Sequence, residues 1–212
     1  MAAVETEWPD YRLERKAAKE GYVPVAGVDE AGCACLAGPV VAAAVILEPK
    51  GIPKGINDSK KLTPEAREAL YAELGARARF AIGVADVARI DTENILNARL
   101  WAMARAVEAL GAAPALALVD GNRAPPVACP ARTVVAGDAR SLSIAAASII
   151  AKVTRDRLMR ELDEECPGYG FASNKGYGTR DHYDALARLG PSCYHRRSFG
   201  PVRDAFLILA SV

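Results

Sequence analysis

The sequence predicts an α/β domain in which a mixed β-sheet is covered by helices. Short apolar runs come first in the chain, segments with helical spacing are inserted between them, and the last third is mostly helical. The chain has 212 residues, of which 51% are hydrophobic, and this suits one domain with a substantial core. We expect residues 21–212 to form this domain and the highly charged residues 1–20 to form an N-terminal segment.

Five apolar segments have the composition of short buried strands. A glycine-containing turn separates the first two of them, and a Pro/Gly-rich loop follows the second. The expected strands cover residues 22–29, 39–47, 79–87, 114–120 and 132–135.

Three longer segments have helical spacing. The first begins at Thr63, a capping residue followed by Pro64 at the first helical position. The second covers residues 91–110 and stops at Gly111, and the third covers residues 141–162. The C-terminal residues 201–212 are apolar enough for a last packed helix or, alternatively, a docking tail for a replication partner.

Charge and cysteine content limit the class of protein. The chain has 27 Lys and Arg against 26 Asp and Glu, so any basic surface for a polyanion must be local. The five cysteines are scattered and no secretory signal precedes them, so we expect reduced thiols and a cytoplasmic location. A zinc site from Cys33, Cys35 and Cys129 is an alternative, but no second close pair supports it. No apolar run approaches the roughly 20 residues of a membrane span.

Four acids adjoin apolar segments. Asp29 and Asp120 end strands, Glu30 follows Asp29, and Asp156 lies on the apolar stripe of the third helix. A buried carboxylate requires a partner. For any one of these acids taken alone a salt bridge is the favoured alternative, and for Asp156 the neighbours that could form it are Arg155, Arg157 and Lys152. Because few buried cations are available for all four acids, a hard divalent cation such as Mg²⁺ is favoured.

The adjacent acids Asp29 and Glu30 raise a geometric difficulty. Neighbouring residues on a regular strand point to opposite faces of the sheet. We therefore expect the strand to end or twist between them, a distortion that the flanking Gly27 and Gly32 would permit.

Several motifs together resemble those of the bacterial ribonuclease HII family. They are GVDEAG followed by LAGPVVAAAVIL, then NDSKKLT, LVDGN, GDARSLSIAAASIIAKVTRDR, PGYGFASNKGYGT and HRRSF, and they extend from about Gly21 to Phe206. The resemblance implies a ribonuclease H-like fold, with a mixed central sheet flanked by helices and a helical C-terminal extension.

The same resemblance implies an endoribonuclease of ribonucleotide excision repair. It would cut the RNA strand of RNA/DNA hybrids and ribonucleotides embedded in DNA, leaving 5′-phosphate and 3′-hydroxyl ends. Carried over by position, Asp29, Glu30, Asp120 and Asp156 would be the catalytic and metal-binding acids. They would hold two Mg²⁺ or Mn²⁺ ions that activate water and stabilise the departing oxygen.

One loop that the family uses to recognise its substrate has a different sequence in this chain. The family uses a Gly-Arg-Gly loop after DEA and a tyrosine in KGYGT; this chain keeps Gly32 and Tyr177 but has Cys33 and Ala34 in the other two loop positions. A thiol cannot replace a guanidinium, and a Cβ would resist a positive φ, so we expect altered strictness or affinity, with loss of activity as the extreme outcome.

A basic track beside the acids would position phosphates, although each of its members could equally be a surface charge. The members are Lys60, Lys61, Lys175, Arg196 and Arg197. We expect His182 and His195 to be structural and the protein to be a monomer. The rival functions are another ribonuclease H-fold metal nuclease, such as a junction resolvase, and a non-catalytic hybrid-binding protein.

Overall fold

The computed structural model describes residues 8–209 and contains a mixed five-stranded sheet in the order β3-β2-β1-β4-β5. β1 pairs antiparallel with β2 and parallel with β4, while β2 pairs antiparallel with β3 and β4 parallel with β5. The strands are β1 (Val25–Ala31), β2 (Val40–Leu47), β3 (Ala78–Ala85), β4 (Leu116–Asp120) and β5 (Ala131–Val134). The predicted mixed sheet is confirmed.

The first strand differs from its expected bounds. It begins at Val25 rather than at residue 22 and continues through Ala31, still paired with β2, where Glu30 lies opposite Ala42. The expected strand end between Asp29 and Glu30 therefore does not occur. On the side of β1 that faces β4, the paired register ends with Val28 opposite Val119.

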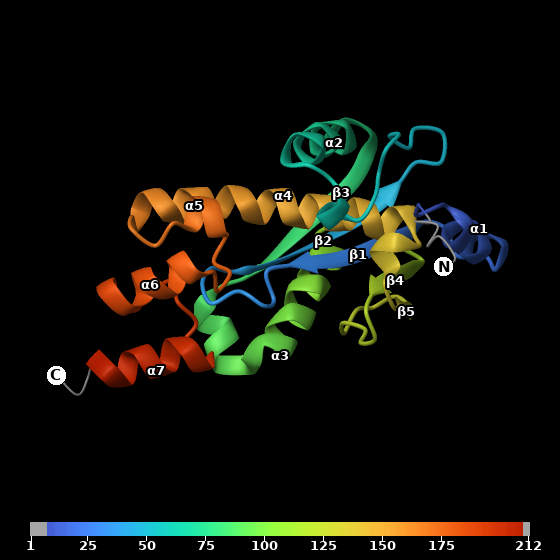
Figure 1. Cartoon of the computed structure of the whole chain (residues 1–212). Helices are drawn as coiled ribbons and strands as arrows, with labels where there is room; N and C mark the ends of the chain where they lie inside the picture. Colours follow the sequence, from blue (N-terminus) through green and yellow to red (C-terminus); the bar gives the residue numbers. More distant parts are fainter. Residues whose placement is uncertain (1–7, 210–212) are drawn as a thin grey trace, which may run out of the picture.

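Helices cover both faces of the sheet (Figure 1). α3 (Val87–Glu108) packs on one face, and α4 (Leu142–Glu165) with α2 (Pro64–Arg77) packs on the other. Alternate residues of β2 enter the two cores: Ala42, Ala44 and Ile46 on the α3 side, and Ala43, Val45 and Leu47 on the α4 side. A strand buried on both faces needs an unbroken apolar run, which is the pattern that predicted it.

The helix starts follow their capping residues. Thr63 accepts a hydrogen bond from the Ala66 N–H, as expected, and Ser141 accepts one from the Ile144 N–H. α3 starts at Val87, earlier than the predicted residue 91, because Asp86 caps it by accepting from the Arg89 N–H.

α3 is interrupted at Asn94, whose φ of 69° and ψ of 163° are not helical. The Asn94 side-chain oxygen accepts hydrogen bonds from the N–H groups of Leu96 and Asn97, so the residue caps the second part of the helix. The apolar periodicity of residues 91–110 does not reveal this break, because core-facing positions continue on both sides of it.

Shorter helices extend the domain at its two ends (Figure 1). The helical C-terminal part is present, as expected; residues 210–212, the end of the suggested docking tail, lie outside the described residues. None of the described helices is long and apolar enough to cross a membrane. The end helices are α1 (Arg12–Lys19), α5 (Phe171–Asn174), α6 (Arg180–Leu189) and α7 (Gly200–Leu209). Two short 3₁₀ turns, η1 (Ser59–Lys61) and η2 (Gly137–Ala139), complete the elements.

The helix α1 lies within the expected N-terminal segment and was not indicated by the sequence pattern. Its Glu14 is 1% exposed and accepts hydrogen bonds from the Ser141 hydroxyl at 2.6 Å and the Ser143 N–H at 2.9 Å. The first N–H groups of a helix have no partner within the helix, and they lie at the positive end of its dipole. The Glu14 carboxylate compensates both at the N-terminus of α4. α1 thereby anchors the helix that spans the α4 face of the sheet.

Candidate active site

Two of the predicted acids lie at neighbouring strand ends. β1 and β4 run parallel with Val28 opposite Val119, so Asp29 and Asp120 are the next facing positions. Facing residues of paired strands point to the same side of a sheet. Asp29 is 4% exposed, and one of its carboxylate oxygens accepts the Glu30 N–H at 2.8 Å.

A further acid, Asp138, joins them from the turn η2. The N–H of Gly137 donates to Asp120 Oδ1 at 2.7 Å, and a Cβ at Gly137 would lie only 3.2 Å from that oxygen. This close turn holds Asp138, which is 7% exposed, near enough for its charge to act on Asp29.

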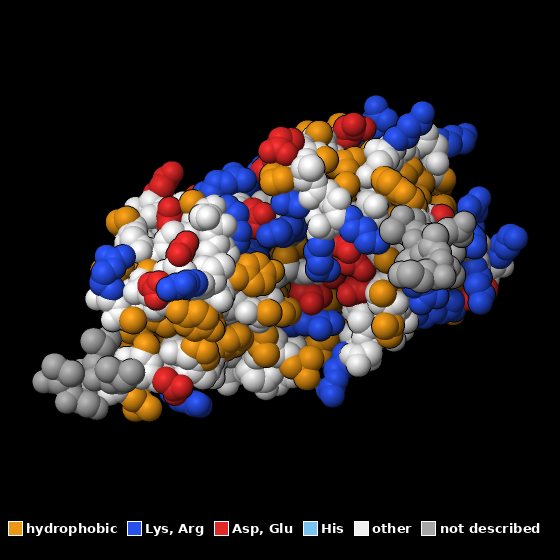
Figure 2. Space-filling model, viewed as in Figure 1, with side chains coloured by type: hydrophobic (Ala, Val, Ile, Leu, Met, Phe, Trp, Pro, Cys, Tyr) orange, Lys and Arg blue, Asp and Glu red, His pale blue; other side chains and the backbone are white. Residues whose placement is uncertain are grey.

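The carboxylates repel one another in a region that water barely reaches. Burial raises the pKa of Asp29 well above its usual range, and the charges of Glu30, Asp120 and Asp138 raise it further. Acidic side chains gather near the centre of the face in Figure 2, with Lys and Arg side chains beside them. Such a buried group of like charges stabilises any cation that enters it.

Glu30 points to the α3 side of the sheet. Burial raises the pKa of Glu30, and Arg99 opposes that rise, with its Nε 3.4 Å from Glu30 Oε1. The other oxygen, Oε2, is buried and has no hydrogen-bond partner among the described residues. An orphaned carboxylate oxygen beside other acids fits a hard divalent cation, which binds oxygen ligands.

Asp138 is paired with a lysine from η1. Lys60 Nζ lies 3.1 Å from Asp138 Oδ2. Burial would lower the pKa of Lys60, but the hydrogen bond to Asp138 and the charges of Asp138, Asp58 and Asp29 raise it overall. Lys60 is thus the predicted basic residue that reaches the acids, and its ammonium partly neutralises them.

No three His, Cys, Asp or Glu side chains already surround one point as a metal-ligand set within residues 8–209. The cysteines of the alternative zinc site form no such set in that part of the chain either. Arg99 and Lys60 hold the outer two carboxylates, while Asp29 and Asp120 form no ion pair among the described residues.

Asp156 is not among the acids whose charges act on Asp29. It is 7% exposed, and its Oδ1 lies 2.7 Å from Lys152 Nζ, so the salt-bridge alternative describes it. Its charge acts on Lys175 and Tyr177. The structure therefore groups Asp138, and not Asp156, with the other three acids. The signal for Asp138 was its place in GDARS, directly after the short strand at residues 132–135.

The altered loop keeps a feasible backbone. Gly32 has a φ of 99°, and a Cβ there would lie 2.0 Å from Arg155 Nε, so this glycine is required. Ala34 is exposed and has no positive φ, so its Cβ is tolerated. The thiol of Cys33 donates to Glu30 Oε1 at 3.5 Å, and burial together with Glu30 raises its pKa to about 12. Cys33 therefore stays neutral beside the acids.

Arg196 is not part of a surface track, contrary to the prediction. It is fully buried, and its guanidinium donates to the carbonyls of Gly32, Cys33 and Gly38 at 2.7 to 3.0 Å. A buried cation satisfied by carbonyls fixes the loop from beneath and offers no free donor to a phosphate.

Arg155 fixes the same loop from α4. It is fully buried and donates to the carbonyls of Ala37, Pro39 and Lys175 at 2.8 to 3.1 Å. Neither Arg155 nor Arg196 was predicted in this role. No local sequence pattern distinguishes them from the exposed arginines beside them, Arg157 and Arg197.

The other predicted substrate-binding residues lie at the surface. Tyr177 is 42% exposed, with Lys152 Nζ 6.0 Å from the centre of its ring. The ammonium group of Lys175 donates a hydrogen bond to the carbonyl of Ala172. Lys61 is exposed next to Lys60, whereas Arg197 is exposed and stacks on Phe206 at 4.5 Å, in the C-terminal part.

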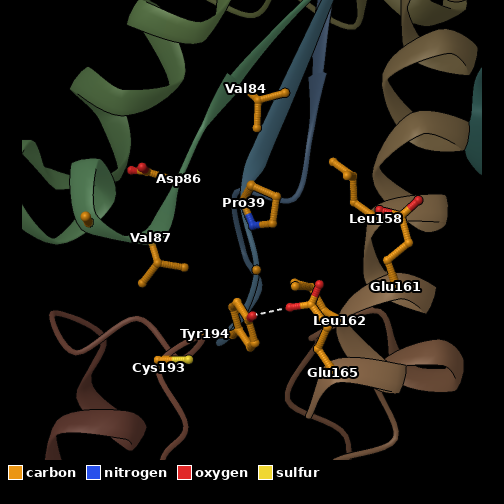
Figure 3. Close-up of a pocket in the computed structure, with 12 residues that line it drawn as sticks. Pro39, Val84, Asp86, Val87, Leu158, Glu161, Leu162, Glu165, Cys193 and Tyr194 are labelled. Carbon is orange, nitrogen blue, oxygen red and sulfur yellow. Dashed lines mark hydrogen bonds between the residues drawn. The ribbon is translucent and has the colours of Figure 1, made fainter.

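A separate groove of about 470 Å³ lies between the start of α3 and the C-terminal half of α4 (Figure 3). Its lining includes Val84, Leu158 and Leu162, and Tyr194, whose hydroxyl donates to Glu165. None of the predicted site residues lines it. The chemistry of the acids is therefore confined to the ends of β1 and β4.

Proteins of the ribonuclease HII family have sequences similar to this chain. The sequence model of the family described as Ribonuclease HII matches residues 26–202. A ribonuclease HII of Rhodopseudomonas palustris (strain BisA53) is 58% identical over 198 residues, which cover 93% of this chain and 71% of that protein.

Solved structures share the fold. The ribonuclease H2 of Pyrococcus horikoshii OT3 aligns with a TM-score of 0.73 at 25% identity, covering 90% of this chain and 100% of that one. In a PCNA:RNase HII complex from Archaeoglobus fulgidus, the values are 0.69 and 27%, covering 84% and 96%. Bst-RNase HIII in complex with Mn²⁺ gives 0.72 at 19%, covering 89% and 71%. With a mixed sheet, the acids at its strand ends and a family match over most of its length, the chain belongs to the ribonuclease HII family.

Proposed function

We propose that Asp29, Glu30, Asp120 and Asp138 form the catalytic centre of this metal-dependent endoribonuclease, which acts on RNA/DNA hybrids. The observation that supports this assignment is the electrostatics of Asp29, whose pKa is raised by burial and by the charges of the other three acids. A group so destabilised in its ionised form has a strong preference for a bound cation.

The donor set fits Mg²⁺ or Mn²⁺. All four side chains offer carboxylate oxygens, and the unpartnered Oε2 of Glu30 provides a ready ligand. When bound, two such ions supply an activated water and stabilise the departing 3′-oxygen of a phosphodiester. The products would be a 5′-phosphate and a 3′-hydroxyl.

The residues of this chain have separable tasks. Asp29 lies centrally, Asp120 and Asp138 approach from the β4 side, and Glu30 approaches from the α3 side. Lys60, held by Asp138, is placed to meet a substrate phosphate once that carboxylate turns to an ion. The half-exposed ring of Tyr177 is the surface on which the sugar next to the ribonucleotide packs.

A matched pair of variants tests the assignment of Asp138 over Asp156. We expect Asp138→Asn to lower kcat on an RNA/DNA hybrid by about a thousandfold or more, because it removes an ion ligand. We expect Asp156→Asn to stay within about tenfold, because that acid pairs with Lys152. The opposite ranking would restore Asp156 to the centre and exclude Asp138.

The finer features of the activity belong to the same proposal. The substrate range includes single ribonucleotides in duplex DNA, and the setting is ribonucleotide excision repair in the cytoplasm. The A. fulgidus relative was solved with PCNA, and a similar replication partner would dock through the C-terminal part that begins with α7. Deleting the segment after residue 199 would then abolish partner binding in a pull-down with the purified clamp protein.

A further inference from the structure

His182 and His195 lie side by side in the interior of the C-terminal part. Their side chains are 0% and 1% exposed, and the ring of Phe171 contacts both at 5.5 Å between centroids. Their Nε2 atoms are 3.0 Å apart. Two buried imidazoles in direct contact must share one proton between the facing nitrogens, which fixes how each ring is protonated.

The backbone decides the direction of this hydrogen bond. The N–H of Ser192 donates to His195 Nδ1 at 3.0 Å, so that nitrogen is an acceptor and His195 has its proton on Nε2. His195 Nε2–H then donates to His182 Nε2, which leaves the proton of His182 on Nδ1. That Nδ1–H donates to the carbonyl of Tyr177 at 2.9 Å. The relay thus runs one way, from Ser192 to Tyr177.

Both imidazoles are neutral, as the relay requires. Burial lowers the pKa of His195 to about 4, with a further contribution from His182, and burial also lowers the pKa of His182. Near pH 7, neither ring holds a second proton that would place two N–H groups against each other.

The same segment holds the altered loop. The backbone of His195 pairs with that of Ala37, and the N–H of Gly38 donates to the carbonyl of Tyr194 at 2.9 Å. The N–H of Leu36 in turn donates to the carbonyl of Gly176 at 2.8 Å. His195 therefore contacts the loop through its backbone and is linked to the carbonyl of Tyr177 through the side chain of His182.

We propose that His182 and His195 are positioning residues that fix the backbone of Tyr177 relative to the loop at residues 32–38 and so set the spacing of the two surfaces that meet the substrate. This inference rests on the proposed role of Tyr177 as the sugar-packing residue. No step of the metal chemistry passes through the pair. Their loss should therefore affect substrate binding and the choice between substrates more than turnover.

The relay can be observed directly in the full chain. Long-range ¹H–¹⁵N NMR correlations at pH 7 distinguish the two neutral tautomers of histidine. We expect the Nε2–H form for His195 and the Nδ1–H form for His182. The same tautomer in both rings, or a rapid mixture, would overturn the relay regardless of whether the enzyme is active.

Three variants separate positioning from simple packing. His182→Leu removes the donor to Tyr177, His182→Asn keeps a donor at the Nδ1 position, and Phe171→Leu weakens the same core without touching the relay. Steady-state cleavage in Mg²⁺ would use a DNA duplex with one ribonucleotide and an all-RNA/DNA hybrid. Binding of both duplexes would be measured by fluorescence anisotropy with Ca²⁺ in place of Mg²⁺, and Tm would be measured for each variant.

For His182→Leu we expect KM and the anisotropy Kd on the single-ribonucleotide duplex to rise about tenfold, the effect of one buried hydrogen bond, with kcat changed less than threefold. His182→Asn should recover most of that loss, and Phe171→Leu should lower Tm comparably with KM near wild type. Equal KM values for His182→Leu and Phe171→Leu, or no rescue by Asn, would overturn the proposal. If the wild type cuts neither duplex, the proposed function fails, while the tautomers and the Ca²⁺ binding series still decide the relay.

Discussion

The acid group and the loop beside it differ in how fully their buried charges are paired. Around Asp29, like charges meet, burial raises the pKa values of Asp29 and Glu30, and Glu30 Oε2 lacks a hydrogen-bond partner among the described residues. Beneath residues 32–39, the cations of Arg155 and Arg196 are buried completely, yet their donors are directed to backbone carbonyls. A bound cation would reduce the repulsion in the acid group. The buried arginines beneath the loop already have hydrogen-bond partners without any ligand.

This difference assigns separate tasks to the two regions. A buried group of carboxylates that repel one another is a binding site for divalent ions. The ion supplies the positive charge that the neighbouring side chains provide only in part. A satisfied arginine clamp keeps its shape whether or not substrate is present. We infer that catalysis depends on the first region and the geometry of recognition on the second, and substitutions in each should have different signatures.

The largest expected effect comes from Asp29→Asn. The change removes the central carboxylate, so kcat on an RNA/DNA hybrid in Mg²⁺ should fall by about a thousandfold or more. Without metal the variant should be more stable, by about 1 to 2 kcal/mol, because the ionised Asp29 is destabilised by burial and three neighbouring charges. Activity assays and urea unfolding in EDTA would measure both.

Magnesium provides the control for that prediction. Added Mg²⁺ should raise the Tm of the wild type more than that of Asp29→Asn, because binding to the folded state alone is stabilising. Two results together would contradict the claim that repulsion among the acids destabilises the metal-free protein. They are a metal-free Asp29→Asn variant less stable than the wild type and a wild-type Tm that does not change with Mg²⁺.

The next largest effect is expected at the clamp. Arg196→Met leaves the carbonyls of Gly32, Cys33 and Gly38 without their donor, and should lower the free energy of unfolding by about 3 kcal/mol. Arg197→Met is the matched control, since that neighbour is exposed and should change stability by less than about 1 kcal/mol. Equal losses in urea titrations would show that burial of Arg196 contributes nothing specific.

The two regions also differ in how well the sequence predicts them. The strands and the acids Asp29 and Asp120 follow from local patterns, because each acid closes an apolar run, although only β4 ends at its acid and β1 continues to Ala31. The sequence pattern does not indicate Asp138, because the turn η2 carries no periodicity, whereas the helical stripe and the family resemblance both point to Asp156. A stripe identifies a buried face, but it does not identify which neighbour fills it, and here Lys152 does.

The clamp was beyond local patterns for a related reason. HRRS contains two adjacent arginines, of which Arg196 is buried and Arg197 exposed. The acceptors of Arg196 lie more than 150 positions away along the chain. Only the tertiary contact distinguishes them, so composition alone gave both the same surface role.

Acid should weaken the recognition region through His195. Its pKa is lowered to about 4 in the folded state, by burial and by His182, and Tyr169 is the other titratable ring in contact with it. The unfolded chain therefore binds the extra proton first, so this contribution is complete above about pH 6.5 and is lost as pH falls toward 4. Between pH 6.5 and 5 the loss should be about 2 kcal/mol.

Urea titrations across that pH range would measure the effect, with His195→Gln as the comparison. Glutamine keeps a donor toward His182 but does not titrate, so its stability should fall less steeply with acid. Parallel curves for the two proteins would assign the acid sensitivity to other groups, such as the carboxylates near Asp29.

The smallest expected effect lies where the two regions meet, in the loop itself. Cys33→Arg combined with Ala34→Gly gives the loop the guanidinium that the family pattern has there. Because the thiol of Cys33 stays neutral beside Glu30, the added charge should improve Kd for a duplex with one ribonucleotide about three- to tenfold, with kcat nearly unchanged. Kd measured in Ca²⁺ at two salt concentrations would test this, since an added phosphate contact steepens the salt dependence. Unchanged Kd and salt slope would mean that the clamped backbone alone, with Gly32 at its required φ, is sufficient for recognition.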